Sequence, residues 1–202
     1  MGETPVTAER PDDAVVAGHD HVTLIGSNEE DTVAFYRDVL GLSLVMRQPN
    51  LDRPEVTHLF FDAGDGRLIT FFVDEGRESH EGAQDPGVGA VHHVAFRVEA
   101  AEIPAIRDRL REAGHDFSEF DRGAFHALYT RDHNGLTIEL AADVYEIPDD
   151  RRGEVLARAH ALRVEAGATH VERDHVERAL SDLGLPVVET GAPDAPSGTG
   201  GL

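Results

Sequence analysis

The sequence predicts an α+β fold in which two tandem βαβββ modules form one curved mixed sheet around a shared cavity. A pattern of strand, helix and three strands occurs over 21–73 and again over 93–141. Each copy opens with a histidine at the start of a strand, and each helix ends at a glycine. Because a module of roughly sixty residues buries a sheet face poorly by itself, we expect the two copies to pack together.

The first copy begins with an alternating, β-branched strand at 21–25. A helix over 29–40 follows, with Asn28 as its N-cap and Gly41 as its end. The pattern then predicts three short strands and one tight turn, at 43–47, 57–62, 67–73 and 63–66.

The second copy repeats this order, starting with a strand at 93–98. Its helix is expected over 101–113 and ends at Gly114. The remaining strands and their turn are expected at 116–121, 124–131, 136–141 and 132–135.

Segments outside the repeat divide the rest of the chain. Residues 1–18 lack a periodic apolar pattern and are interpreted as a flexible leader, followed by the paired modules over 19–146. Two amphipathic stretches, 150–166 and 170–183, predict a helical extension over 147–186. The Gly- and Pro-rich residues 187–202 are interpreted as a disordered tail.

Composition excludes several classes of function. The 202-residue chain has 39 acidic residues against 18 arginines and no lysine, a net charge of −21. This excess repels phosphate backbones and anionic membranes, so neither a nucleic-acid nor a membrane partner is expected. Such an acidic, lysine-free composition is typical of halophilic proteins. The absence of cysteine excludes disulfides and thiolate metal sites, and the sequence shows no signal for secretion, so a cytoplasmic location is expected.

Three side chains form a candidate metal site. His21 and His93 open equivalent strands, so a pseudo-twofold axis would bring them together. Glu139 interrupts an apolar strand, and a buried carboxylate requires a cation or several donors. Two imidazoles and one carboxylate are the facial triad of non-haem Fe(II) oxygenases. From spacing alone, unrelated histidines and an exposed glutamate remain an alternative.

Four motifs together resemble those of the vicinal oxygen chelate superfamily, which includes glyoxalase I, antibiotic-resistance binding proteins and extradiol dioxygenases. They are HDHVTL at 19–24, AFYRDVLGL at 34–42, VHHVAF at 91–96 and NGLTIEL at 134–140. The resemblance extends over roughly 18–143. Three further motifs resemble the ring-cleaving dioxygenases that act on hydroquinones: THLFF at 57–61, LITFF at 68–72 and FHALYTRD at 125–132.

This resemblance implies specific roles for several residues. It implies metal ligation by His21, His93 and Glu139, and catalytic or substrate-contacting roles for Tyr129, His92 and Arg122. The sequence departs from the branch at Asp20, where a second histidine is more usual. It also has two modules where many members of the branch have four.

The pocket is expected to include His58, Phe71 and His126, each with a structural alternative. His58 and Phe71 could be packed core residues, and His126, a candidate acid or base, could face solvent. Glyoxalase I relatives supply a second carboxylate where this chain has Thr70, and threonine is a poor ligand for a divalent ion. Three protein ligands therefore favour a dioxygenase over an isomerase.

The sequence thus predicts an Fe(II)-dependent extradiol-type dioxygenase that cleaves an aromatic diol, such as a catechol or hydroquinone, with dioxygen. Mn(II) fits the same ligands, and Zn(II) or Ni(II) is less favoured. Two alternatives stay open: a glyoxalase-like metal-dependent isomerase or lyase, and a non-enzymatic small-molecule binding protein. A homodimer is also compatible with the sequence.

Overall fold

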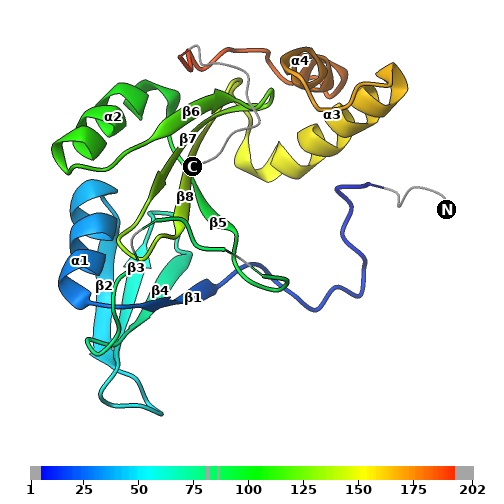
Figure 1. Cartoon of the computed structure of the whole chain (residues 1–202). Coiled ribbons are helices and arrows are strands. Elements are labelled where there is room, and N and C mark those ends of the chain that lie inside the picture. The colour runs from blue at the N-terminus through cyan, green and yellow to red at the C-terminus, as the bar shows by residue number, and fades with distance from the viewer. Residues whose placement is uncertain (1–5, 81, 86, 194–202) are drawn as a thin grey trace.

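A computed structural model of the protein describes residues 6–80, 82–85 and 87–193, in which two four-stranded mixed sheets carry the fold (Figure 1). In the first sheet the strand order is β1-β4-β3-β2, with β1 parallel to β4 and the other pairs antiparallel. Its elements are β1 (His21–Gly26), α1 (Glu29–Val33), the π-helical η1 (Ala34–Val39), β2 (Ser43–Pro49), β3 (Thr57–Asp62) and β4 (Leu68–Val73).

The second sheet repeats this topology, with the order β5-β8-β7-β6 and β5 parallel to β8. Its elements are β5 (His93–Arg97), η2 (Ala100–Glu102), α2 (Ile103–Glu112), β6 (Ser118–Asp121), β7 (Phe125–Arg131) and β8 (Thr137–Asp143). The predicted pair of βαβββ modules is confirmed.

Strand register shows that the two modules are equivalent residue by residue. Thr23 pairs with Thr70 in the first sheet, and Ala95 pairs with Glu139 in the second. Both pairs lie two residues beyond the histidine that opens the strand. Thr70 therefore occupies the position in the first module that Glu139 occupies in the second.

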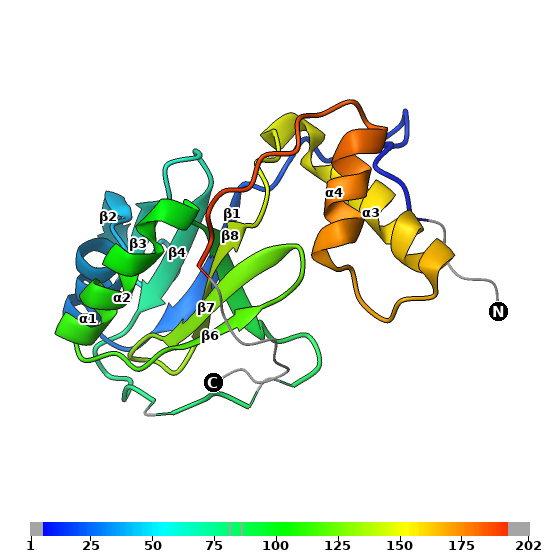
Figure 2. The ribbon, with the colours of Figure 1, turned by 90° about the horizontal axis from the view of Figure 1, so that it is seen from above.

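The sheets do not merge into the single curved sheet that the sequence predicts. Within the described residues, the edge strands β1 and β5 pair only inside their own sheets, with β4 and β8. Helices α1 and α2 lie on one side of both sheets, whereas the C-terminal helices lie on the other (Figures 1 and 2). The modules are held together through the α1 and α2 side rather than by strand pairing.

A hydrophobic core shared by both modules fills that side. It includes Phe71 of β4, whose side chain is 1% exposed and whose ring centroid lies 4.5 Å from that of Tyr36. Alternation along β4 directs Phe71 toward the helices and Thr70 and Phe72 to the other face. This corrects the prediction that Phe71 lines the substrate pocket.

A buried polar network joins the modules at the same interface. The Tyr36 hydroxyl donates to Asp132 Oδ2 at 3.0 Å, and Asp132 Oδ1 accepts from the backbone N–H groups of Asn134 and Leu136, each at 2.9 Å. Ser27 Oγ donates to Asn134 Oδ1 at 2.7 Å. Asp132 thus fastens the β7–β8 turn of the second module to the helix of the first.

The helix predicted over 29–40 changes type after Val33. Residues Ala34–Val39 form a π-helix, in which Leu40 N–H donates to the Phe35 carbonyl at 3.0 Å. The wider turn places the neighbouring aromatic side chains of Phe35 and Tyr36 in the core, at 2% and 0% exposure.

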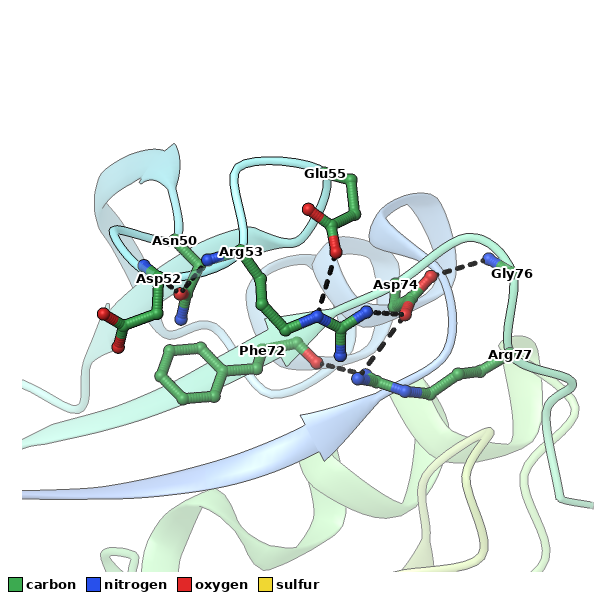
Figure 3. A network of polar contacts seen from close by, with 8 residues as sticks. All are labelled: Asn50, Asp52, Arg53, Glu55, Phe72, Asp74, Gly76 and Arg77. Atoms are coloured by element: carbon green, nitrogen blue, oxygen red, sulfur yellow. Dashed lines mark hydrogen bonds and ion pairs between the residues drawn. The ribbon is translucent and has the colours of Figure 1, made fainter.

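A cluster of polar contacts around Arg53 and Arg77, here called the loop clasp, connects the β2–β3 loop to the end of β4 (Figure 3). Arg53 Nε donates to Glu55 at 2.9 Å, and Arg53 also reaches Asp74 at 3.3 Å. Arg77 Nη1 donates to the Phe72 carbonyl at 2.7 Å. These contacts tie the β2–β3 loop to the end of β4.

The C-terminal extension consists of η3 (Asp149–Arg151), α3 (Arg152–Ala166) and α4 (Arg173–Asp182), with a small core of its own. After α4 the chain returns to the second sheet, where Thr190 Oγ1 donates to the Asp143 carbonyl at 2.6 Å and Glu146 N–H to that of Val188 at 2.9 Å. The predicted disordered tail is therefore attached at 188–190, and 194–202 lies outside the described residues.

The predicted leader is only partly described. Residues 6–18 contain no helix or strand, and 1–5 lie outside the described residues. No helix in the described part of the chain has the length and apolar character needed to cross a membrane.

Gly123 allows the extension to dock on the β6–β7 hairpin. Its φ is +79°, and a Cβ there would lie 2.2 Å from the Val171 carbonyl oxygen. We expect Gly123→Ala to lower the free energy of unfolding by about 2 kcal/mol or more, because backbone strain adds to a backbone clash. Denaturant unfolding measures this. Gly114→Ala is the control, since Gly114 has a φ of +77° but a Cβ there would meet no atom within 4 Å. Equal losses in the two variants would contradict the docking role.

Candidate metal and substrate site

A carboxylate on β8 is the centre of the candidate site. Glu139 Oε2 lies 3.0 Å from His93 Nε2 of β5, and Glu139 Oε1 accepts from the Tyr129 hydroxyl of β7 at 2.8 Å. The Glu139 side chain is 7% exposed, whereas that of His93 is 38% exposed. β8 lies between β5 and β7, so three adjacent strands bring these side chains together.

Two more predicted residues adjoin this group. Arg122 Nε donates to the Tyr129 hydroxyl at 3.3 Å, and the guanidinium carbon lies 5.1 Å from the centre of the Tyr129 ring. His92 Nδ1 lies 2.9 Å from His93 Nδ1. When neutral His93 donates from Nε2 to Glu139, its Nδ1 can only accept, so His92 must then donate.

The Tyr129 hydroxyl is held in its protonated form. Burial raises the pKa of Tyr129, and the hydrogen bond to Glu139 raises it further, against an opposing effect of Arg122. At neutral pH Tyr129 is therefore a donor to the carboxylate.

The first module contributes a second group of side chains. His21 Nδ1 lies 2.5 Å from Asp20 Oδ1. Asp20, the residue at which the sequence departs from the family pattern, therefore contacts the predicted metal ligand His21. The ring of His58 packs between those of Phe60 and Phe72, at 3.9 and 4.5 Å between centroids. Burial lowers the pKa of His58, and the charge on His21 lowers it further, while His58 Nε2 is buried without a hydrogen-bond partner.

The structure joins only part of the predicted metal triad. His93 and Glu139 are in contact, but no three His, Asp or Glu side chains among the described residues stand close enough to hold a metal ion. His21 therefore does not lie close enough to His93 and Glu139 to complete the triad. The donor types still suit a divalent ion, because a buried carboxylate and a neighbouring imidazole are two of the three ligands of a facial triad.

His126 is not part of this site. It is 1% exposed, and its Nε2 lies 3.0 Å from Glu119 Oε2. Glu119 also accepts two hydrogen bonds from Arg107 of α2, both at 2.5 Å. Alternation along β7 sends His126 and Tyr129 to opposite faces, which corrects the prediction that His126 lines the pocket.

The position equivalent to Glu139 carries no carboxylate. Thr70 Oγ1 donates to Thr23 Oγ1 at 2.8 Å, and Thr70 is fully buried. The two modules thus share a fold but differ at this position, where only the second module carries a carboxylate.

A cleft beside Arg122 was not predicted from the sequence. It has a volume of about 1210 Å³ and lies between the β6–β7 hairpin and the α3–α4 helices. Arg163 and Arg173 line it together with Arg122. The only related signal in the sequence is the high arginine content of the C-terminal stretches. No motif links those arginines to the β6–β7 hairpin, so the cleft could not be predicted.

Comparison with known protein families identifies the family to which the two modules belong. Residues 18–140 match the family described as the Glyoxalase/Bleomycin resistance protein/Dioxygenase superfamily. The chain belongs to this superfamily. The match covers both modules and ends before α3, so the C-terminal helices lie outside it.

Individual relatives agree with the superfamily assignment. The chain is 32% identical over 105 residues to a Bacillus subtilis protein named "Putative ring-cleaving dioxygenase MhqE", covering 50% of this chain and 33% of the relative. It is 30% identical over 140 residues to the B. subtilis protein named "Putative ring-cleaving dioxygenase MhqA", covering 63% of this chain and 41% of the relative. The chain therefore spans well under half the length of these relatives.

Solved structures show the same fold. The crystal structure of a B. subtilis protein named "putative dioxygenase" aligns with a TM-score of 0.55 and 28% identity, covering 62% of this chain and 40% of that one. A glyoxalase/bleomycin resistance/dioxygenase domain from Frankia aligns with a TM-score of 0.55 and 18% identity, covering 63% and 98%. The second comparison bears on the fold alone.

Proposed function

We propose that the protein is a metal-dependent dioxygenase that opens the ring of an aromatic diol. The observation that carries this proposal is the nearly buried carboxylate of Glu139, in contact with His93 and with a protonated Tyr129. The names of the B. subtilis relatives support the same reaction class.

In this proposal His21, His93 and Glu139 hold Fe(II), and Mn(II) suits the same ligands. The bound metal would supply coordination of the diol and activation of dioxygen. One imidazole and the carboxylate already adjoin each other, and His21 opens the equivalent strand of the first module.

The remaining side chains act on the substrate and on the ligands. Tyr129 orients the Glu139 carboxylate through its hydroxyl, and Arg122 stabilises negative charge on a substrate oxygen. His92, bonded to His93, is placed to accept or return a proton. His58, with its Nε2 buried and unpaired, lies on the same face of the first sheet as Thr70.

Replacing Tyr129 by phenylalanine tests the orienting role. We expect Tyr129→Phe to weaken Mn(II) binding by about 10- to 100-fold, because a ligating carboxylate loses its donor. Titration with Mn(II) alone, followed by the signal of the free ion, gives the affinity. Tyr145→Phe is the matched control, since Tyr145 donates to Glu177 at 3.4 Å, outside the site. An unchanged affinity in Tyr129→Phe would contradict the role.

The proposed function is tested by reconstituting the chain with Fe(II) under anaerobic conditions and then screening dihydroxybenzenes on an oxygen electrode. Oxygen uptake that depends on both iron and the diol supports it. Binding of Zn(II) or Ni(II) with turnover of a substrate and no oxygen uptake would instead indicate an isomerase or lyase. Failure to bind any divalent ion would indicate a small-molecule binding protein.

A further inference from the structure

The cleft beside Arg122 is built by segments from two parts of the chain. One wall is the hairpin between β6 and β7, and the other is α3 with the loop that leads into α4. Two contacts hold the walls together. Gly123 lies against the Val171 carbonyl, and Arg173 donates to Asp121 at 3.0 and 3.2 Å. These contacts join the two walls of the cleft. Helices α3 and α4, which contribute one wall, lie on one side of the sheets (Figure 2).

Part of the cleft is apolar. Phe125 and Val171 line it, as does Leu156 of α3, which is 37% exposed although it is a large hydrophobic residue. Apolar walls with a few polar groups are typical of sites for small organic ligands. This surface suits the face of an aromatic ring.

Cationic groups converge on the same space. Arg122, Arg163 and Arg173 line the cleft together with His170, in a chain whose net charge is −21. Arg163 donates to the carbonyls of Ala168 and Thr169 at 2.9 and 3.5 Å, which are neutral acceptors.

Two of the three acidic residues that line the cleft, Asp121 and Glu172, are already engaged. Asp121 accepts from Arg173 and from the Gly123 N–H at 2.7 Å. The Glu172 side chain caps the first turn of α4. Asp174 is 68% exposed, and the nearby His175 Nδ1 already accepts from the Glu172 N–H at 3.0 Å, so this carboxylate is not paired through that nitrogen. Within the described residues Arg163 forms no ion pair, and its Nη2 lies 3.4 Å from His160 Nδ1, so its charge is available to a ligand. A planar guanidinium suits a carboxylate.

Arg122 connects this cleft to the candidate metal site. It lines the cleft and also donates to the Tyr129 hydroxyl, which donates in turn to Glu139. Arg122 thus borders both the cleft and the group formed by Tyr129, Glu139 and His93.

We propose that the cleft binds the carboxylate-bearing side of an aromatic substrate, with Arg163 as its main anion-binding group. Resting on the proposed function, this makes the substrate a dihydroxybenzene with an acidic substituent. The specificity then comes from the C-terminal helices, which lie outside the superfamily match.

Binding is tested first without any catalysis. The full chain, treated with a chelator so that no metal can capture a carboxylate, is titrated with benzoate and with the neutral analogue benzamide by calorimetry. We expect benzoate to bind about tenfold more tightly or better, since a charge-assisted hydrogen bond distinguishes the two, and added salt to reduce that preference.

Two variants and one control locate the binding. Arg163→Gln removes the charge, and Leu156→Asp adds a repelling carboxylate at an exposed position without touching Arg163. Each should abolish the preference for benzoate over benzamide, and Leu156→Asp should also weaken benzamide binding because it replaces part of the apolar wall. Arg53→Gln makes the same charge change in the loop clasp of Figure 3, and should behave like the unmodified chain. Benzoate preference that survives both cleft variants would overturn the proposal, as would equal binding of benzoate and benzamide.

Turnover by the iron-loaded chain separates this inference from the proposed function. We expect kcat/KM for 2,5-dihydroxybenzoate to exceed that for hydroquinone by about tenfold or more, and Leu156→Asp to remove the difference. Oxygen uptake with equal preference for the two diols would overturn the substrate assignment and leave the dioxygenase proposal standing. Selective benzoate binding with no oxygen uptake on any diol would overturn the dioxygenase proposal and leave the anion site standing.

Discussion

Glu139→Gln should remove metal binding while leaving the fold intact. Glutamine keeps the size of the side chain and can still accept from Tyr129, but it removes the carboxylate that contacts His93 at this site. We expect the affinity for Mn(II) to fall by more than about 100-fold, beyond the effect of losing a partner that only orients a ligand.

Thermal unfolding with and without Mn(II) measures this effect. An ion present at about 100 times its dissociation constant stabilises the native state by about 2.7 kcal/mol, which corresponds to a shift of roughly 5–10 °C for a domain of this size. Glu139→Gln should show no such shift. Glu112→Gln, on the exposed end of α2, should retain it. A metal-dependent shift of the original size in Glu139→Gln would show that another group holds the ion.

Asp132→Ala should be the most destabilising single change at the module interface. Asp132 is 6% exposed and accepts from the Tyr36 hydroxyl and from two backbone N–H groups. Burial and the Asp132 charge raise the pKa of Tyr36 well above its usual value, so its hydroxyl stays protonated and requires an acceptor. Removal of the carboxylate leaves three buried donors unpaired, at a cost of about 3–5 kcal/mol.

Denaturant unfolding of Asp132→Ala measures this loss, with Tyr36→Phe as a graded comparison. Tyr36→Phe removes one donor and leaves the carboxylate bound to the backbone, so it should cost only about 1 kcal/mol. Asp108→Ala, at an exposed position on α2, should change little. A loss in Asp132→Ala no larger than that in Tyr36→Phe would show that the network does not hold the modules together.

Much of the fold could be predicted because the same order of strands and helices occurs in both modules, so each module supports the assignment of the other. The strand predicted at 57–62 has the observed bounds of β3, and the glycines at 41 and 114 follow the helices as expected. The π-helical turn could not be predicted, because its apolar residues fit the spacing of an α-helix equally well. What distinguishes the two is the hydrogen bond from Leu40 to Phe35, which the residue pattern does not encode.

The sequence pattern could group side chains that share one strand face, but it could not orient side chains on strands that are buried on both faces. Tyr129 and Glu139 are cross-strand partners on β7 and β8, and both face the site. His126 and Phe71 lie on buried strands as well, where alternation is certain but the direction of each face is not. Arg163 could not be assigned at all, since its place in the cleft depends on how α3 docks on the β6–β7 hairpin.

The hydroxyl pair of Thr23 and Thr70 has an electrostatic consequence for any divalent ion held beside Glu139. With one carboxylate as the sole anionic ligand, the complex keeps a formal charge of about +1, which two carboxylates would cancel. In the proposed function, a diol that had lost one proton would supply the charge that neutralises it. A threonine in place of a second carboxylate would thus leave a divalent ion held beside Glu139 with a net positive charge, which favours an anionic ligand.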